Sequence, residues 1–247
     1  MDTALSWRRI YLDCDELPIR HIDLSFGINY VRRPVKDGRR DMFRHCLEWP
    51  ALLPTQLKDL VALLNEALVL PMTEEFDALL ALDWYKIPDD DLPPEAWDNT
   101  EVGEMVRQAK YFVTNASRQR AARKDLVRRL ADAMVRHPAL NSAFYVVSVP
   151  GHQGDGTSTG ELIAADLAAR TGKTLVSTTG QPRPERKDDR SVDLVGMFTL
   201  PMKLDAPCVI VDDVYRSGDT IRQVARVARQ AGAPRVYGLA AAKTIRS

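Results

Sequence analysis

The sequence predicts an α/β protein whose second part forms a mostly parallel sheet, behind an acidic α+β N-terminal domain. Two observations lead to this prediction. From residue 99 onward, short apolar runs alternate with stretches of helical spacing, and such alternation builds parallel sheets through right-handed crossovers. The 247 residues are 45% hydrophobic and 28% charged, which is the balance of a globular chain that is long enough to bury a core.

Composition also excludes some classes of protein. No apolar run approaches the roughly 18 residues that a membrane helix needs, and the first residues contain no apolar segment typical of a secretory signal. The three cysteines, Cys14, Cys46 and Cys208, lack the short spacing of a zinc site. We therefore expect a cytoplasmic protein with reduced thiols, no membrane contact and no zinc.

A domain boundary is predicted at residues 89–98, which are acidic and include two adjacent prolines. Such a stretch cannot continue a helix, so we divide the chain into residues 1–98 and 99–247. The elements predicted before the boundary are strands over 7–14 and 19–31, a helix over 56–68, and a short helix over 74–82 capped by Thr73.

Residues 99–247 carry the alternating pattern. Ser158 and Glu161 have the spacing of a capping box, and Gly232 closes the last helix. Residues 180–193 are polar and predict an excursion between two strands. The predicted helices span 101–110, 118–136, 161–170 and 218–232, and the predicted strands span 143–149, 174–178, 208–213 and 235–242.

The net charge of zero hides an asymmetry between the two parts. Residues 1–98 hold 11 Lys/Arg and 19 Asp/Glu, whereas residues 99–247 hold 23 and 15. Much of the excess lies in residues 107–136, with nine Lys/Arg and two Asp. We favour neutralisation of the two parts by packing; binding of nucleic acid to the basic stretch is the less favoured alternative.

The most informative stretch is residues 208–220. A buried apolar strand ends in Asp212 and Asp213, and a short loop then enters a helix. Ligands bind at the carboxyl ends of strands in open α/β sheets, and a glycine loop at a helix N-terminus suits a phosphate. Ionised carboxylates accept hydrogen bonds from sugar hydroxyls, so this order of residues predicts a sugar-phosphate site. The loop residues are Ser217, Gly218, Asp219 and Thr220.

This stretch resembles the phosphoribosyl pyrophosphate (PRPP) signature of type I phosphoribosyltransferases. More of the chain, over residues 101–247, is similar to the ComF-like branch of that family. The similar segments are Lys110–Tyr111, residues 160–172 after the first strand, and residues 190–198. The branch's N-terminal cysteine zinc module is absent.

The resemblance implies transfer of the phosphoribosyl group from PRPP with release of pyrophosphate. Asp212 and Asp213 would hold the ribose hydroxyls, Asp213 also acting in catalysis, and residues 217–220 would form the 5-phosphate loop. Arg216, which is unusual for the family, is a further PRPP-binding candidate because it would compensate for the charge of Asp219. Residues 180–193 would be a mobile hairpin whose Arg190 neutralises the leaving pyrophosphate. Mg²⁺ would bridge the pyrophosphate and the ribose, with Asp212 and Asp213 as its only candidate protein contacts. The residues implied to face the pyrophosphate are Pro150, Gly151 and His152.

Departures from the family pattern keep a second function open. Asp155 replaces an arginine near the expected pyrophosphate, and the family's basic residues after the first strand are missing. Asp219 also stands where the family carries a small residue. The alternative is a non-catalytic sensor of PRPP or a nucleotide, which would contact nucleic acid through its basic helix. The acceptor stays unassigned. We expect residues 1–98 to form a hood or a partner surface, and a homo-oligomer is compatible with the sequence.

Overall fold

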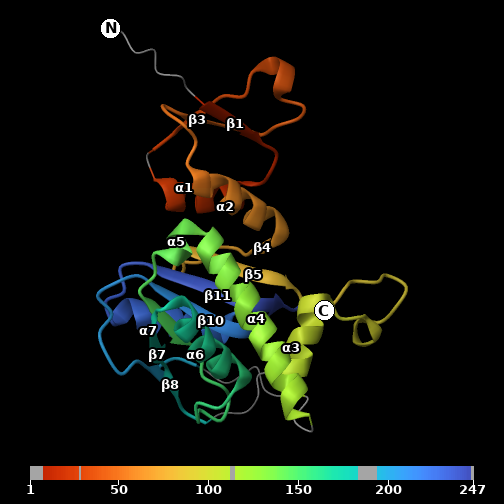
Figure 1. Cartoon of the computed structure of the whole chain (residues 1–247), viewed down its shortest axis with the longest axis vertical. Helices are drawn as coiled ribbons and strands as arrows, with labels where there is room; N and C mark the ends of the chain where they lie inside the picture. Colours follow the sequence, from red (N-terminus) through yellow and green to blue (C-terminus); the bar gives the residue numbers. More distant parts are fainter. Residues whose placement is uncertain (1–7, 28, 112–114, 183–193, 246–247) are drawn as a thin grey trace.

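The computed structural model describes residues 8–27, 29–111, 115–182 and 194–245, and they form two stacked bodies (Figure 1). The elements, in chain order, are β1 (Arg8–Leu12), α1 (Glu16–Phe26), β2 (Val31–Arg33), η1 (Asp37–Arg39), β3 (His45–Trp49), α2 (Thr55–Glu66), β4 (Leu68–Val69), β5 (Ala78–Trp84), η2 (Pro94–Ala96), α3 (Glu101–Tyr111), α4 (Ala116–Arg136), α5 (Pro138–Asn141), β6 (Tyr145–Ser148), α6 (Thr159–Thr171), β7 (Thr174–Ser177), β8 (Thr179–Gly180), β9 (Phe198–Thr199), β10 (Cys208–Tyr215), α7 (Asp219–Gln230) and β11 (Val236–Lys243).

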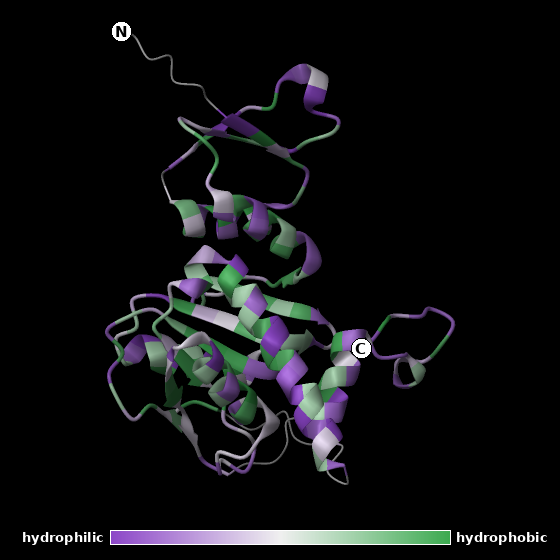
Figure 2. Cartoon of the chain, in the orientation of Figure 1, coloured by the Kyte–Doolittle hydropathy of each residue, from purple (hydrophilic) through white to green (hydrophobic). Residues whose placement is uncertain are grey.

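The larger body is built on a six-stranded sheet in the order β4-β5-β11-β10-β6-β7. All neighbouring strands are parallel except β4 and β5. Val209 and Val211 face the core beneath α3, α4 and α6, whereas Cys208 and Ile210 face the core beneath α7. Figure 2 shows the resulting pattern, with mostly apolar strands and a hydrophilic outer side of α4. The predicted α/β class with a mostly parallel sheet is confirmed.

The predicted boundary at residue 98 needs correction, because the sheet takes strands from both sides of it. β5 pairs with β11 in parallel, although residues 74–82 were expected to form a helix. Its residues Ala78–Ala81 are all fully buried, since both faces of this central strand are covered, and a strand buried on both faces lacks the alternation that identifies strands in sequence. Arg226 and Glu75 add an ion pair of 2.7 Å between α7 and the segment before β5.

The smaller body, here called the N-terminal module, comprises residues 8–66. Its antiparallel sheet has the order β1-β3-β2, and α1 and α2 cover one face around Leu47 and Trp49. The strand predicted over residues 19–31 is wrong for most of its length, because α1 occupies residues up to Phe26. Ile19, Ile22 and Phe26 are its buried apolar residues, and their spacing is that of a helix face.

The module contacts the larger body through α1 and α2 (Figure 1). His21 Nδ1 lies 2.9 Å from His137 Nε2, and both side chains are fully buried. Glu66 and Arg136 form an ion pair of 2.7 Å. Leu24 and Leu64 pack against the core of the larger body. The two bodies are therefore joined by apolar and polar contacts. In the part of the chain that the structure describes, no helix has the length and apolar character needed to cross a bilayer.

Candidate functional site

Asp212 and Asp213 lie side by side near the carboxyl end of β10. The backbone N–H of Asp213 donates a hydrogen bond of 2.9 Å to Asp212 Oδ1. Asp213 is buried, with 8% of its surface exposed, and Asp212 is partly exposed. Burial raises the pKa of the Asp212 carboxyl well above its ordinary value, and the neighbouring Asp213 carboxylate raises it further. A bound cation or hydrogen-bond donor would therefore stabilise the ionised form of Asp212.

Lys110, near the end of α3, faces this pair. Its Nζ lies 3.4 Å from Asp213 Oδ2. The attraction of the Asp213 carboxylate raises the pKa of the Lys110 ammonium, against the opposing effect of burial. A cation thus balances part of the negative charge at this end of β10.

The loop after β10 makes its turn at Gly218. This residue has φ +79°, and a Cβ built on it would lie 2.3 Å from the hydroxyl of Tyr215, so only glycine fits. Gly218 is also the N-cap of α7 and gives it no side-chain cap. Asp219 accepts hydrogen bonds from Ser217 Oγ and from Arg222 Nη2, the second at 2.6 Å. The carboxylate of Asp219 therefore bonds both to the loop residue Ser217 and to Arg222 within α7.

The loop after β6 is built around the buried carboxylate of Glu161. Its Oε2 accepts hydrogen bonds from the N–H groups of Gly151 and Ser158, both at 3.2 Å, and from Ser158 Oγ at 2.5 Å. Ser158 Oγ in turn accepts from Glu161 N, which completes the predicted capping box of α6. A Cβ on Gly151 would lie 2.5 Å from Ser158 Cβ, so the loop tolerates only glycine at this close approach.

The two loops and the ends of α3 and α4 enclose a pocket of about 400 Å³. Seven of the predicted site residues line it; they are Asp212, Asp213, Arg216, Thr220, Pro150, Gly151 and His152. Ser217, Gly218 and Asp219 belong to the same loop but are not part of the lining. Arg190 lies outside the described residues, as do residues 183–193 of the predicted hairpin, while β8 and β9 pair on either side of that segment.

Some lining residues were given no role by the sequence. Lys110 was noted only as part of a family-like segment, and Gln119, Arg123 and Leu162 were not singled out. They lie on three helices that are separate in sequence, so only the helical spacing of Gln119 and Arg123 could have placed two of them on one face. In addition, Gly160 approaches the acid pair so closely that its Cβ would lie 3.3 Å from Asp212 Oδ1.

Two expectations about the surroundings of the pocket change. Asp155 accepts hydrogen bonds from Thr157 N and Thr157 Oγ1 at 3.0 and 2.8 Å, and it does not line the pocket. These bonds lower its pKa, so the Asp155 carboxylate stabilises the turn in which it lies.

The hood expected from residues 1–98 is not formed by the N-terminal module, because the lining contains no described residue before Ala109. Within the described ranges, no group of three or more His, Cys, Asp or Glu is arranged to hold a metal ion.

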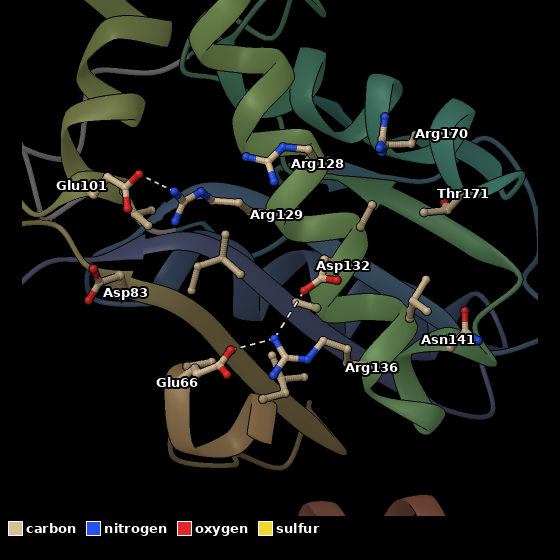
Figure 3. A pocket seen from close by; sticks show the side chains of 17 residues that line it. Glu66, Asp83, Glu101, Arg128, Arg129, Asp132, Arg136, Asn141, Arg170 and Thr171 are labelled. Atoms are coloured by element: carbon tan, nitrogen blue, oxygen red, sulfur yellow. Dashed lines mark hydrogen bonds and ion pairs between the residues drawn. The ribbon is translucent and has the colours of Figure 1, made fainter. Parts of the chain in front are cut away.

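A larger pocket of about 770 Å³ lies between α2, β5, α3, α4 and α6 (Figure 3). Its charged side chains largely pair with each other. Arg129 binds Glu101, and Arg136 binds both Glu66 and Asp132 (Figure 3). None of the residues that the sequence predicted for the site lines this pocket, so the smaller pocket is the candidate site despite its size.

Comparisons with known proteins give only distant similarities. No protein-family model matches the sequence, and no curated protein matches it significantly. Among solved structures, a purine phosphoribosyltransferase from Pyrococcus horikoshii aligns with 18% identity and a TM-score of 0.34, over 49% of this chain and 86% of the other.

Two further solved structures align at similar levels. An orotate phosphoribosyltransferase from Aeropyrum pernix has 24% identity and a TM-score of 0.32, over 52% and 59% of the two chains. An adenine phosphoribosyltransferase from Leishmania tarentolae has 11% identity and a TM-score of 0.38, over 70% and 94%. At identities this low, the chemistry of the pocket has to be argued from its own residues.

Proposed function

We propose that this pocket binds PRPP and transfers its phosphoribosyl group to a nucleophile, releasing pyrophosphate. One observation supports the proposal most strongly. The acid pair near the end of β10 is followed at once by a tight glycine turn and by α7, whose N-cap residue contributes no side-chain cap. A carboxylate pair for hydroxyls and a helix N-terminus for phosphate are what a ribose 5-phosphate requires.

Each wall of the pocket has a part in this proposal. The 5-phosphate would lie against Arg216 and Thr220 at the start of α7, and the ribose hydroxyls would donate to Asp212 and Asp213. The pyrophosphate would lie against Pro150–His152. In the reaction, the acceptor's lone pair forms a bond to C1 of the ribose. The C1–O bond breaks with its electrons passing to pyrophosphate, and the acceptor's proton passes to solvent.

The carboxylates of Asp212 and Asp213 suit Mg²⁺, which the family resemblance implies. Mg²⁺ prefers oxygen ligands and is commonly held by one or two carboxylates together with substrate phosphates, so two carboxylates without a larger cluster fit that mode. When bound, the ion would supply positive charge to the leaving pyrophosphate. Lys110 would balance part of the charge of the pair, because its Nζ lies 3.4 Å from Asp213 Oδ2.

Calorimetry with PRPP and Mg²⁺ tests the proposal. Replacing both Asp212 and Asp213 by Asn should weaken PRPP binding at least about 100-fold, since charged hydrogen-bond acceptors contribute roughly 1.5–3 kcal/mol each. Asp155→Asn is the matched control, because Asp155 lies near the pocket but, among the described residues, bonds only within its turn; it should leave the PRPP affinity unchanged. Equal affinity in the double variant and the wild type would overturn the proposal.

Reversible binding of PRPP or a nucleotide without transfer is the second candidate. The observation in its favour concerns Asp219. Its carboxylate accepts a hydrogen bond from the Ser217 hydroxyl and adds negative charge to the expected phosphate loop. Release of pyrophosphate, measured with a coupled assay over a panel of nitrogen bases, separates the two functions. Binding without any pyrophosphate release would favour the sensor.

A further inference from the structure

One wall of the pocket remains when the proposed places of phosphate, ribose and pyrophosphate are filled. It is formed by Lys110 near the end of α3, Gln119 and Arg123 on α4, and Leu162 on α6. We call these four residues the helical wall. Because the loops after β6 and β10 are assigned to PRPP, we assign the helical wall, among the described residues, to the acceptor.

Arg123 is the fixed cation of this wall. Its Nε donates a hydrogen bond of 2.8 Å to Asp166 Oδ2, and 23% of its side chain is exposed. Its other guanidinium nitrogens donate no hydrogen bond to any described residue, and they belong to a side chain that lines the pocket. The bond to Asp166 holds the guanidinium in place, so its remaining donors are available to a ligand at little cost in ordering.

Gln119 lies one turn before Arg123 on the same helix. Its side-chain amide makes no hydrogen bond within the described ranges, and it also lines the pocket. Residues four apart face the same side of a helix, so an amide and a guanidinium lie next to each other on this wall. Leu162 adds an apolar contact on α6.

The charges of the lining are segregated. Among the described lining residues, the only carboxylates are Asp212 and Asp213 on β10, whereas the helical wall has two cations and no acid. The charge of Lys110 is shared with Asp213. Within the described ranges, Arg123 pairs only with Asp166, which does not line the pocket. A guanidinium with free donors in a partly buried wall favours a planar anion that can accept two parallel hydrogen bonds.

We infer that the acceptor is a nitrogen base that carries a carboxylate, bound by Arg123 with Gln119 beside it. This inference rests on the proposed function, because it assigns the acceptor of that same transfer. Leu162 would contact the face or edge of the ring. The nucleophilic nitrogen would then point toward the ribose between the helical wall and Asp213.

Matched pairs of bases test this inference. Orotate against uracil, and nicotinate against nicotinamide, differ mainly in the carboxylate. With PRPP and Mg²⁺ present, we expect the carboxylated member of at least one pair to bind about 10- to 100-fold more tightly, since a hydrogen bond to a charged group contributes roughly 1.5–3 kcal/mol. Arg123→Ala should remove this preference while leaving the Kd of PRPP unchanged.

Three further variants separate binding from folding. Arg120→Ala removes an exposed arginine of α4 that does not line the pocket, and it should keep the preference. Asp166→Asn removes the ion pair but leaves Arg123, so it should also keep a preference even where it lowers stability. Gln119→Ala should reduce the preference by a smaller factor than Arg123→Ala.

The possible outcomes are distinct. If PRPP itself fails to bind, the proposed function fails and the acceptor assignment falls with it. If PRPP binds but neither carboxylated base binds more tightly than its neutral partner, the acceptor assignment alone is overturned. Retention of the preference in Arg123→Ala would likewise overturn it.

Discussion

The loops after β6 and β10 stand at the same edge of the sheet, but they treat the helices that follow them differently. The loop after β6 fills the N-terminus of α6 with its own Glu161 carboxylate, which binds Gly151 and Ser158. The loop after β10 starts α7 at Gly218, which offers no side-chain cap, and the N–H of Asp219 donates to Ser217 Oγ at 3.5 Å. A buried carboxylate is therefore bound within the loop at the start of α6, whereas a hydroxyl contacts the first N–H group of α7.

Because of this difference, we expect the two loops to bind different parts of one ligand at the same edge of the sheet. A helix N-terminus without a capping carboxylate attracts an anion through its N–H groups and its dipole. A capped one contributes a rigid wall, and Gly151 brings that wall close to the capping residue Ser158. We therefore expect the loop after β10 to bind the phosphate directly and the loop after β6 to act mainly through its shape.

The largest effect is expected from Gly218→Ala, which tests the difference between the loops after β6 and β10. The new Cβ would meet the Tyr215 hydroxyl at a residue with φ +79°, so we expect a loss of about 2–5 kcal/mol in the free energy of unfolding from strain and overpacking. PRPP binding should be lost as well. Urea unfolding and calorimetry measure the two quantities.

Gly156→Ala is the matched control for this change. Gly156 has the same φ of +79°, but a Cβ there would meet nothing within 4 Å, so only the backbone strain of about 1–2 kcal/mol applies. If both variants lose the same stability and keep PRPP binding, the tight turn at Gly218 has no special part in the site.

Glu161→Gln tests the loop after β6. The neutral side chain weakens the bonds from Gly151 and Ser158, and we expect a loss of about 1.5–3 kcal/mol in the free energy of unfolding, the usual contribution of a hydrogen bond to a charged group. The affinity for ribose 5-phosphate should change less than threefold. A fall in that affinity as large as the one in Gly218→Ala would contradict the separate roles of the loops.

Acid pH should weaken the contact between the N-terminal module and the larger body without involving either loop. Burial lowers the pKa of His21 to about 4 and that of His137 to about 3, whereas the unfolded chain titrates near 6.5. Both histidines therefore stay neutral in the folded protein while the unfolded chain takes up protons. The stabilisation is present above pH 6.5 and is lost as the pH falls toward 4.

When the pH is lowered from 7 to 6, protonation of the two histidines in the unfolded chain should lower the free energy of unfolding by about 1 kcal/mol. The loss per pH unit should be larger below pH 6. Urea unfolding at several pH values measures it. In His21→Leu the dependence should become shallower, because one of the two titrating groups is gone. An unchanged slope in that variant would show that other groups cause the acid loss.

The smallest expected effect sharpens the comparison at the loop after β10. Asp219→Ser removes the carboxylate that accepts from Ser217 and Arg222. Because that carboxylate repels a phosphate and occupies the Ser217 hydroxyl, we expect the affinity for ribose 5-phosphate to rise about two- to fivefold. Arg222→Ala is the control, and it should not raise the affinity. An unchanged or lower affinity in Asp219→Ser would mean that the carboxylate does not compete with the ligand.

The features that the sequence predicted well depend on residues that are close together in the chain. β10, the acid pair, Gly218 and α7 follow one another within residues 208–230, and the capping box of Ser158 and Glu161 spans four residues. Local patterns of this kind carry their own geometry.

The features that the sequence did not predict depend on contacts between distant residues. β5 was mistaken for a helix because neighbours on both faces bury its first four residues, Ala78–Ala81, completely, and this error displaced the domain boundary. Lys110 reaches Asp213 across 103 positions of the chain, and His21 meets His137 across 116. Such pairs exist only once the sheet and its helices are assembled.

Hydrogen–deuterium exchange on the full chain with ribose 5-phosphate tests the central claim most directly. The claim is that the loop after β10 holds the phosphate and the ribose, whereas the loop after β6 serves the pyrophosphate, which this ligand lacks. We expect slower exchange in residues 212–222 and little change in residues 151–158. Slower exchange confined to residues 151–158, or to residues 128–136 beside the larger pocket, would contradict the account.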